Sequence, residues 1–273
     1  MGSLEDRLAA LRALLRDIGP CLVAFSGGVD STFLLRVAHD VLGEGAVAVT
    51  AVSASLPASE RDAALDLARR MGVRHLVIET REMDDPGYVR NDGRRCYYCK
   101  RELFSVLRSV VDGARGRTIV YGAIPDDLGE ERPGMRAAAE AGVRAPLIEA
   151  GIDKRAIREL SRRLGLPTWN KPAMACLASR IPRHTEVTAA ALARVERAEA
   201  ALRALGYRQV RVRYRGSGAR VELDPEGLAR SGSRAARRRL VAAVRSSGFD
   251  EVLIDPLGYR PGGADAPAGP QTA

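Results

Sequence analysis

The first 165 residues alternate short apolar runs with segments in which apolar residues recur at helical spacing. The apolar runs predict buried strands over Cys21–Phe25, Ala46–Val52, His75–Thr80 and Thr118–Ala123. The helical spacing predicts helices over Leu4–Asp17, Thr32–Leu42, Ser59–Met71, Tyr98–Val111 and Asp153–Leu164. Strands that alternate with helices of this length predict an α/β fold with a doubly wound parallel sheet.

The pattern changes after this part of the chain. Residues Trp169–Pro182 are too rich in helix and strand breakers to form regular structure, so we predict a loop. Beyond it, helices over Thr188–Leu205 and Ser233–Ser246 and strands over Tyr207–Tyr214, Ala219–Asp224 and Glu251–Ile254 predict a small α+β domain. The predicted organisation is a first domain over 1–165, a connecting loop over 166–186, a second domain over 187–260 and a disordered tail over 261–273.

Composition and charge narrow the function classes. The 273 residues carry a formal charge of +9, almost all of it from arginine, since the lysines are Lys100, Lys154 and Lys171. This balance fits either nucleic-acid binding or a site for a phosphorylated small molecule. The aromatic content of 4% offers few stacking platforms for single strands, so nucleic acid is the weaker expectation.

The sequence also bears on the compartment. No apolar run has the length that spans a bilayer, so we expect no membrane partner. The N-terminal segment MGSLEDRLAALRALLRD is amphipathic and contains acidic residues, which is not the pattern of a signal peptide. We therefore expect a cytoplasmic protein with reduced thiols and no structural disulfide between Cys96 and Cys99.

The string SGGVDS, which we call the phosphate loop, begins at Ser26 and ends at Ser31, between the first predicted strand and helix. Gly27 and Gly28 let the backbone approach a phosphate chain, and the helix start supplies N–H donors and a positive dipole end. The two serines add hydroxyl donors, and Asp30 can hold the Mg²⁺ that bridges phosphates. An ordinary Gly-rich turn is the alternative, but the complete string at this place favours phosphate binding. It is not a Walker A loop, because it lacks the GxxxxGK[ST] spacing.

The cysteines are the next candidates for chemistry. Cys21 lies in the first predicted strand, where a buried core thiol is the ordinary interpretation. Cys96 and Cys99 form a C-x2-C pair after two arginines and before a predicted helix, and both the cations and the helix start favour thiolate. Cys176 is a candidate nucleophile or ligand, which makes 166–186 the candidate active-site loop. Unrelated small apolar residues and a dithiol redox pair remain alternatives.

Two further groups place charge where ligands bind. Asp126 and Asp127 follow the fourth predicted strand at its carboxyl end, where they could orient Mg²⁺ or a substrate carboxylate, with a helix cap as the alternative. Arg132 in the same loop could reach a phosphate. Arg211 and Arg213 alternate along a strand and so share one face, where two guanidinium groups suit a phosphate. A solvated strand face is the alternative.

The phosphate loop resembles the PP-loop of the ATP pyrophosphatase superfamily, whose members include NAD and GMP synthetases, argininosuccinate synthetase and tRNA-thiolating enzymes. Members adenylate a carbonyl or carboxyl oxygen with ATP, release pyrophosphate and let a nucleophile displace AMP. The resemblance implies that the phosphate loop holds the pyrophosphate and that Asp30 binds Mg²⁺. It also implies that adenine lies near the end of the second strand, around Thr50–Ser53, and it makes Asp127 an ATP-site candidate.

Three more motifs, YGAIPDDLGEERPG, WNKPAMACLASRIP and RVRYRGSGARVELDP, resemble one family closely, the ATP-dependent sacrificial sulfur transferases of LarE type. With SGGVDS they span nearly the whole chain in order. The resemblance implies adenylation of a carboxylate of pyridinium-3,5-dicarboxylic acid mononucleotide. A cysteine corresponding to Cys176 then forms a thioester and gives up its sulfur, which leaves thiocarboxylate on the product and dehydroalanine in the protein. Two rounds give the precursor of the nickel-pincer nucleotide of lactate racemase.

The resemblance also implies site residues. Ser179, Arg180, Arg211 and Arg213 would bind the substrate phosphate, with Glu222 in the same region. Members of the family include homo-oligomers, so a homo-oligomer is expected.

The C-x2-C pair with the loop cysteine resembles family variants that hold a [4Fe–4S] cluster through three thiolates, here Cys96, Cys99 and Cys176. The open fourth iron would hold an extra sulfide, so that Cys176 is not consumed. Zinc is the alternative and is disfavoured, because His is rare and no second C-x2-C pair occurs.

Three rival functions differ in what they need. A tRNA-thiolating PP-loop enzyme needs a large basic surface and usually further C-x2-C pairs, which the chain lacks. A glutamine- or ammonia-dependent synthetase is disfavoured because the chain shows no amidotransferase domain. A nucleotide-binding regulator would keep the phosphate loop without catalysis, and pyrophosphate release would exclude it.

Overall fold

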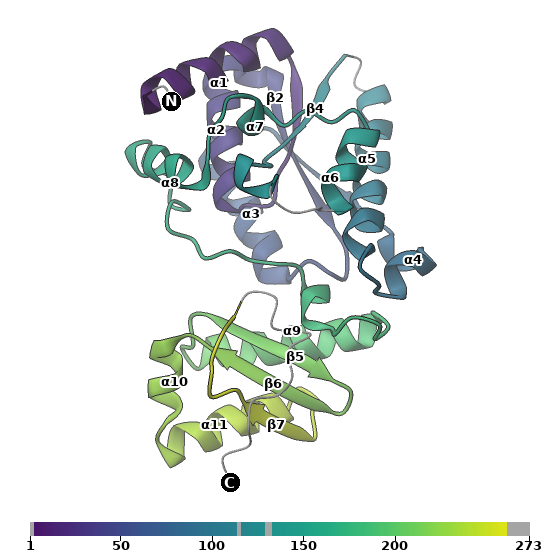
Figure 1. Cartoon of the computed structure of the whole chain (residues 1–273), viewed down its shortest axis with the longest axis vertical. Helices are drawn as coiled ribbons and strands as arrows, with labels where there is room; N and C mark the ends of the chain where they lie inside the picture. The colour runs from purple at the N-terminus through teal and green to yellow at the C-terminus, as the bar shows by residue number, and fades with distance from the viewer. Residues whose placement is uncertain (1–2, 114–115, 129–132, 261–273) are drawn as a thin grey trace. The chain divides into compact units, whose positions relative to one another are not determined.

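The structure is a computed structural model that describes residues 3–113, 116–128 and 133–260 (Figure 1). The tail predicted over 261–273 and Arg132 lie outside the described residues.

The chain divides into two compact units. The first unit joins the chain up to Asp85 to the segment Arg94–Met174. The second unit joins Pro86–Gly93 to the chain from Ala175 onward. The short segment Pro86–Gly93, which lies within the first predicted domain in sequence, thus packs with the second unit.

A four-stranded parallel sheet forms the centre of the first unit. Its strands are β1 (Cys21–Ala24), β2 (Ala46–Val52), β3 (His75–Glu79) and β4 (Thr118–Tyr121). Their order is β3-β2-β1-β4, which confirms the predicted parallel sheet. Because the chain runs from β1 outward to β3 and then returns to the other side of β1, the strand order reverses between β1 and β4. Ligands of open α/β sheets bind at the carboxyl ends of the strands beside such a reversal.

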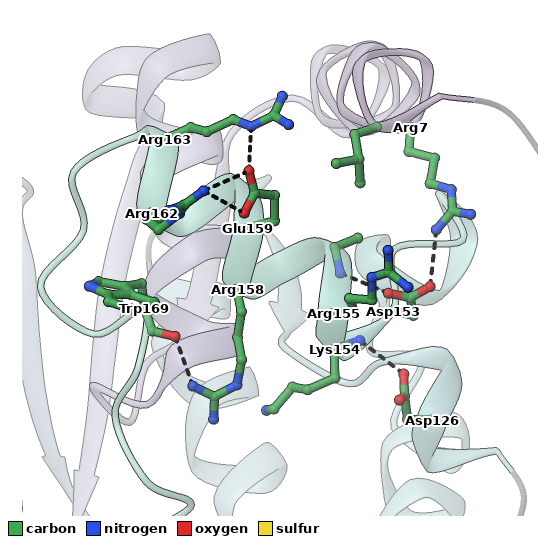
Figure 2. A pocket seen from close by; sticks show the side chains of 12 residues that line it. Arg7, Asp126, Asp153, Lys154, Arg155, Arg158, Glu159, Arg162, Arg163 and Trp169 are labelled. Atoms are coloured by element: carbon green, nitrogen blue, oxygen red, sulfur yellow. Dashed lines mark hydrogen bonds and ion pairs between the residues drawn. The ribbon is translucent and has the colours of Figure 1, made fainter.

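Helices cover both faces of this sheet (Figure 1). They are α1 (Leu4–Ile18), α2 (Val29–Leu42), α3 (Ala58–Arg70), α5 (Arg95–Gly113), α6 (Pro133–Glu140), α7 (Pro146–Glu149) and α8 (Lys154–Arg163). Short 3₁₀ turns are η1 (Gly43–Gly45), η2 (Glu82–Asp84) and η3 (Pro125–Asp127). A pocket of about 1110 Å³ opens beside α8 and the start of α1 (Figure 2).

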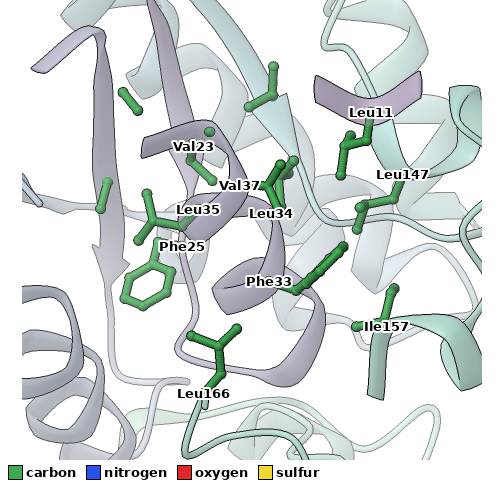
Figure 3. Close-up of a cluster of buried hydrophobic side chains, with 14 of the residues drawn as sticks. Leu11, Val23, Phe25, Phe33, Leu34, Leu35, Val37, Leu147, Ile157 and Leu166 are labelled. Carbon is green, nitrogen blue, oxygen red and sulfur yellow. The ribbon is translucent and has the colours of Figure 1, made fainter. Parts of the chain in front are cut away.

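Successive strand residues point to opposite faces of the sheet and fill two cores. On one face, Cys21 and Val23 pack with α1, α2, α3, α7 and α8, in the cluster around Phe33 (Figure 3). On the other face, Leu22 packs with α5 and α6 around Phe104. A strand that is buried on both faces needs apolar residues at every position, which explains the continuous apolar runs in the sequence.

The helix predicted over Tyr98–Val111 begins three residues earlier, at Arg95. The prediction that Cys96 and Cys99 precede a helix is therefore wrong, since both lie in the first turns of α5. Arginine is a good helix former, which allows the helix to start at the pair of arginines before the cysteines.

Two other local expectations also differ. The helix expected to start from a Ser59 cap begins at Ala58 after Pro57, which fixes the backbone but gives no side-chain cap. The loop predicted over Trp169–Pro182 contains a short 3₁₀ turn, η4 (Leu177–Arg180). The short helices α6 and α7 were not predicted, although each begins with proline, which is favoured at the first helical position.

The second unit contains a three-stranded sheet in the order β5-β6-β7, with β5 and β6 antiparallel and β6 and β7 parallel. The strands are β5 (Val210–Arg215), β6 (Gly218–Leu223) and β7 (Glu251–Ile254). The helices are α4 (Pro86–Val89), α9 (Ala189–Ala204), α10 (Pro225–Ser231) and α11 (Arg234–Arg245). The RGSG string forms the hairpin turn, in which Gly216 has a φ of 67°. No helix in the described part of the chain combines the length and the apolar character needed to cross a bilayer.

Candidate functional site

The phosphate loop follows β1 and continues into the first turn of α2, and its two serines bond to each other. The hydroxyl oxygens of Ser26 and Ser31 are 3.1 Å apart, and the Ser26 N–H donates to Ser31 Oγ over 3.3 Å. The Gly28 N–H donates to Ser26 Oγ over 3.4 Å, which is a long contact. The hydroxyls hold the loop together through weak bonds that a phosphate oxygen can replace.

The N-terminus of α2 has the features of an anion site. Gly28 is its N-cap residue, and no side chain caps its first N–H groups. Side chains do cap α1, α8 and α9, from Ser3, Asp153 and Thr188. The uncapped end leaves backbone donors and the positive end of the helix dipole for a negative ligand.

Two glycines allow other elements to pack closely on the phosphate loop. Gly27 has a φ of 65°, and a Cβ there would lie 3.1 Å from the Cβ of Ala64 on α3. Gly122 follows β4, and a Cβ there would lie 3.0 Å from the backbone nitrogen of Ser31. A side chain at either position would displace α3 or the start of α2, so the shape of the loop depends on both glycines.

Asp30 is held by a lysine from α8. Lys154 Nζ lies 2.7 and 2.6 Å from the two carboxylate oxygens of Asp30. The backbone N–H of Lys154 donates to Asp126 Oδ2 over 3.1 Å. Asp127 Oδ2 instead accepts the Ile124 N–H over 3.1 Å and closes the turn η3. The structure therefore brings Asp30 and Asp126 to the same residue of α8.

A second lysine reaches the phosphate loop itself. Lys171 Nζ donates to the carbonyl oxygen of Gly27 over 3.1 Å and pairs with Glu60 Oε2 at 2.8 Å. Arg158 fixes the backbone around this lysine, because it donates to the carbonyl oxygens of Trp169 over 2.8 Å and of Lys171 over 3.1 Å. Both the side chain and the backbone of Lys171 are thus tied to the first unit.

The pocket beside α8 is lined by Lys154, the partner of Asp30, and by several arginines. Figure 2 shows Arg163 and Glu159 at one end, and Lys154 with Asp126 at the other. Basic side chains outnumber acidic ones in its lining, which comprises Leu4, Arg7, Asp126, Asp153, Lys154, Arg155, Ala156, Arg158, Glu159, Arg162, Arg163 and Trp169. Much of this charge is already paired, as in the 2.7 Å bond between Arg163 and Glu5.

The residues expected near adenine are engaged inside the first unit. Thr50 is buried, donates to the carbonyl oxygen of Phe25 over 2.7 Å and lies 2.8 Å from His75 Nε2. Burial lowers the pKa of His75. Ser53 Oγ donates to Glu82 Oε1 over 2.5 Å. These bonds fix the side chains at the carboxyl end of β2.

The cysteines differ in environment. Cys21 is fully buried, and burial raises the pKa of its thiol to about 11, so it is a core residue. Cys96 is exposed and Cys99 half-buried, three positions apart on one face of α5. Cys176 is exposed and is the N-cap residue of η4. None of the four forms a disulfide.

Among the residues that the structure describes in each unit, no three His, Cys, Asp or Glu side chains gather closely enough to hold a metal ion. Cys96 and Cys99 belong to the first unit, and Cys176 belongs to the second.

Arg180 and Glu199 form a fully buried ion pair in the second unit, with both side chains 0% exposed. Two bonds of 2.8 and 3.0 Å join them. Arg180 also donates to the carbonyl oxygens of Ala175 over 2.6 Å and of Cys176 over 2.9 Å. Burial alone would raise the pKa of Glu199, but the hydrogen bonds and charge of Arg180 hold it below its ordinary value. Arg180 therefore anchors the turn that carries the cysteine.

Arg211 and Arg213 are buried, so the alternative of a solvated strand face is wrong. Arg213 pairs with Glu222 at 2.7 Å and donates to the carbonyl oxygen of Ser179 over 3.0 Å. Burial, together with the charge of Arg180, lowers the pKa of Arg211. The second unit thus brings the four predicted phosphate-binding residues into one neighbourhood, in which positive charge is concentrated away from water.

Comparisons with known proteins show which family the chain resembles. The Asparagine synthase family model matches residues 4–90, which include the phosphate loop. An uncharacterized protein of Synechocystis sp. is 44% identical over 259 residues, covering 95% of this chain and 97% of that protein. An uncharacterized protein of Methanocaldococcus jannaschii is 25% identical over 239 residues, covering 88% of this chain and 90% of that protein.

A named relative decides the family. The pyridinium-3,5-bisthiocarboxylic acid mononucleotide synthase of Lactiplantibacillus plantarum is 37% identical over 264 residues, covering 96% of this chain and 95% of that enzyme. The chain belongs to the LarE family of PP-loop proteins.

Sequence reasoning did not single out several residues that shape this LarE-family site: Glu60, Glu82, Asn91, Lys154 and Glu199. Glu199 carried a usable signal. It lies on the buried face of α9 with Leu192, Val195 and Leu202, at helical spacing. A carboxylate among apolar positions requires a buried partner, which here is Arg180.

Asn91 and Glu82 gave no such signal. Asn91 has a φ of 55°, and its side-chain nitrogen donates to the carbonyl oxygens of Pro182 over 2.7 Å and of Thr185 over 2.9 Å. Glu82 Oε1 accepts Ser55 Oγ over 2.8 Å, while Oε2 is buried without a hydrogen-bond partner in the described part of the chain. Both act through contacts that only the folded chain creates.

Proposed function

We propose that this LarE-family chain is an ATP-dependent sulfur transferase of nickel-pincer nucleotide biosynthesis. Its substrate is pyridinium-3,5-dicarboxylic acid mononucleotide, one carboxylate of which becomes a thiocarboxylate. The observation that carries the proposal is the 37% identity, over 96% of this chain, to a relative named for the bisthiocarboxylic product. The phosphate loop of the first unit and the buried arginines of the second provide anion-binding groups that suit ATP and a mononucleotide phosphate.

The first unit is proposed to bind ATP and activate the substrate. The phosphate loop and the uncapped start of α2 receive the phosphates. Asp30 provides the carboxylate that Mg²⁺ requires, Asp127 lies across the strand reversal, and the segment Thr50–Ser53 meets the adenine end. A carboxylate oxygen of the substrate attacks the α-phosphorus of ATP, the bond to pyrophosphate breaks, and an acyl adenylate forms.

The second unit is proposed to hold the substrate phosphate and deliver sulfur. Ser179, Arg211 and Arg213 bind the phosphate, and Arg180 acts from its buried pair with Glu199 by holding the turn that carries Ser179. The Cys176 thiolate attacks the acyl carbon and AMP departs with its electron pair, which gives a thioester. Loss of the Cα proton of Cys176 to solvent and cleavage of its Cβ–Sγ bond leave thiocarboxylate on the product and dehydroalanine in the chain.

An alternative source of sulfur uses the three thiols Cys96, Cys99 and Cys176 as ligands. The donor set fits a [4Fe–4S] cluster, because none of these thiols is in a disulfide and two share one face of α5. When bound, such a cluster supplies sulfide at its open corner, so that Cys176 survives turnover. An intact Cys176 after many turnovers supports this route, and conversion of Cys176 to dehydroalanine supports the single-use route.

The test measures pyrophosphate release and thiocarboxylate formation with ATP, Mg²⁺ and the dicarboxylic mononucleotide. Wild-type protein is expected to give both products. Cys176→Ala is expected to release pyrophosphate without forming thiocarboxylate, and Cys21→Ala serves as the matched control that keeps both. Sulfur incorporation into bulk tRNA instead of the mononucleotide would establish the tRNA-thiolating rival. No pyrophosphate with either substrate would indicate a nucleotide-binding protein without this activity.

A further inference from the structure

We propose that Lys171 is a positioning residue that couples occupancy of the phosphate loop to the segment carrying Cys176. The inference rests on the proposed function and concerns how its two chemical steps are linked. Lys171 lies five positions before Cys176 in the string KPAMAC. Its ammonium nevertheless contacts the phosphate loop, 144 positions away in sequence.

Lys171 fixes the orientation of one peptide group in the phosphate loop. Its ammonium donates to the carbonyl oxygen of Gly27 over 3.1 Å. The same peptide group carries the Gly28 N–H, and in a trans peptide the C=O and N–H bonds point in opposite directions. A cation on the carbonyl therefore directs this N–H away from Lys171 and polarises it as a donor.

The Gly28 N–H is well suited to donate a hydrogen bond to a ligand. Its bond to Ser26 Oγ is long, at 3.4 Å, so exchanging it for a bond to a phosphate oxygen costs little. Because a charged acceptor strengthens the bond, the peptide plane that Lys171 sets becomes more favourable once a phosphate is bound.

Lys171 is held on several sides, so the contact is a defined one. Glu60 Oε2 pairs with its ammonium at 2.8 Å, and the side chains of the pair are only 16% and 22% exposed. One turn further along α3, Ala64 packs against Gly27. Arg158 holds the carbonyl oxygen of Lys171 at 3.1 Å. A change in the peptide plane of Gly27 must therefore shift the lysine or break its ion pair.

Linkage makes this contact act in both directions. If Lys171 strengthens phosphate binding, bound phosphate strengthens the hold on Lys171 by the same factor. The chain from Lys171 to Cys176 can reach at most about 18 Å when fully extended, so fixing its first residue limits where the thiol can go. ATP would thus restrict the cysteine segment before the acyl adenylate forms.

The experiment is hydrogen–deuterium exchange of residues 171–180 in the full-length protein, with Mg²⁺ and the non-hydrolysable analogue α,β-methylene-ATP. The analogue is expected to slow exchange in the wild-type segment. Lys171→Met is expected to raise the analogue Kd about 3- to 10-fold, because it removes one charge-assisted bond. In Lys171→Met at saturating analogue, residues 171–180 should exchange as fast as they do in the same variant without the analogue. Lys171→Arg keeps the cation and should restore part of the slowing.

Two further variants serve as a control and as a second test of the coupling. Arg16→Met removes an exposed cation of α1 and should behave as wild type. Glu60→Gln keeps the ammonium but removes its partner, and should lose part of the slowing even if Lys171→Met fails to fold. Full slowing in Lys171→Met and Glu60→Gln, or no slowing in a wild-type protein that binds the analogue, would overturn the coupling. Calorimetry that shows no analogue binding by wild type would instead overturn the proposed ATP site, and the coupling with it.

Discussion

Lys154 Nζ contacts both carboxylate oxygens of Asp30, at 2.7 and 2.6 Å. The contact joins the first residue of α8 to the phosphate loop across 124 sequence positions. The side chains are 34% and 25% exposed, so solvent screens the pair and its net contribution to stability is small. Its main consequence concerns the proposed site, because the ammonium neutralises the carboxylate that we propose as a Mg²⁺ ligand.

Asp30→Asn tests the assigned metal role. The amide cannot supply the charge that Mg²⁺ needs, so pyrophosphate release should fall at least about 100-fold. The free energy of unfolding should change by less than about 1 kcal/mol, because the lost ion pair is partly solvated. Asp40→Asn is the matched control, since Asp40 lies on the same helix and pairs with Arg36 at the surface. Near-wild-type release by Asp30→Asn would refute the role.

Glu199→Gln tests the buried pair that anchors the cysteine turn. The change leaves Arg180 buried without a counter-charge, so the free energy of unfolding should fall by about 3–5 kcal/mol in urea titrations of the intact chain. The double variant Arg180→Met with Glu199→Leu should lose less than the sum of the single losses. A loss no larger than that of Asp40→Asn would show that the pair contributes little.

The same pair predicts a pH dependence. The folded-state pKa of Glu199 lies below its ordinary value of 4.5. A depressed carboxyl pKa gives stability that is present above the unfolded value and is lost as pH falls through the folded value. Unfolding titrations should therefore show wild type losing stability below pH 4.5, and Glu199→Gln losing less of it over the same interval. Parallel pH curves for the two proteins would contradict this.

The sequence predicted those strands and loops whose local residue pattern is distinctive. Strands buried on both faces appear as continuous apolar runs, and the phosphate loop is a complete string at a strand end. Lys154 and Lys171 carried no such signal, because the residues they contact lie 124, 144 and 111 positions away. Only the order of the strands brings these segments to one edge of the sheet.

The arginines of β5 show a second limit. Alternation showed that Arg211 and Arg213 share a face, but it could not show that the face is covered. Some of their contacts come from distant segments: Arg213 donates to the carbonyl oxygens of Ser179 and Arg260, and Arg211 lies 5.2 Å from the ring centroid of Tyr259. Such contacts between distant segments form only in the folded chain, so the spacing of residues along one strand cannot reveal them.

Iron content tests the three proposed thiolate ligands. Protein purified without oxygen should contain about four irons and about four acid-labile sulfides per chain, or about five sulfides when the open iron is loaded. Changing Cys96, Cys99 or Cys176 to Ala should remove most of the iron. Cys21→Ala should keep it, because that thiol is fully buried and its pKa is raised to about 11. Iron that persists in all three ligand variants would contradict the assignment of these cysteines. Zinc found in place of iron would show that the thiolates hold zinc instead of a cluster.

Arg211→Met separates substrate binding from folding. Burial and the charge of Arg180 lower the pKa of Arg211, so this cation is unfavourable for the folded state. Its removal should leave the free energy of unfolding unchanged or raise it by up to about 1 kcal/mol. The KM for the mononucleotide should rise at least about tenfold, with kcat within about threefold, because the proposed bond to the non-reacting phosphate is lost. Arg208→Met, an exposed neighbour, is the control and should change neither. An unchanged KM with lower stability would mean that Arg211 supports the fold and not the substrate.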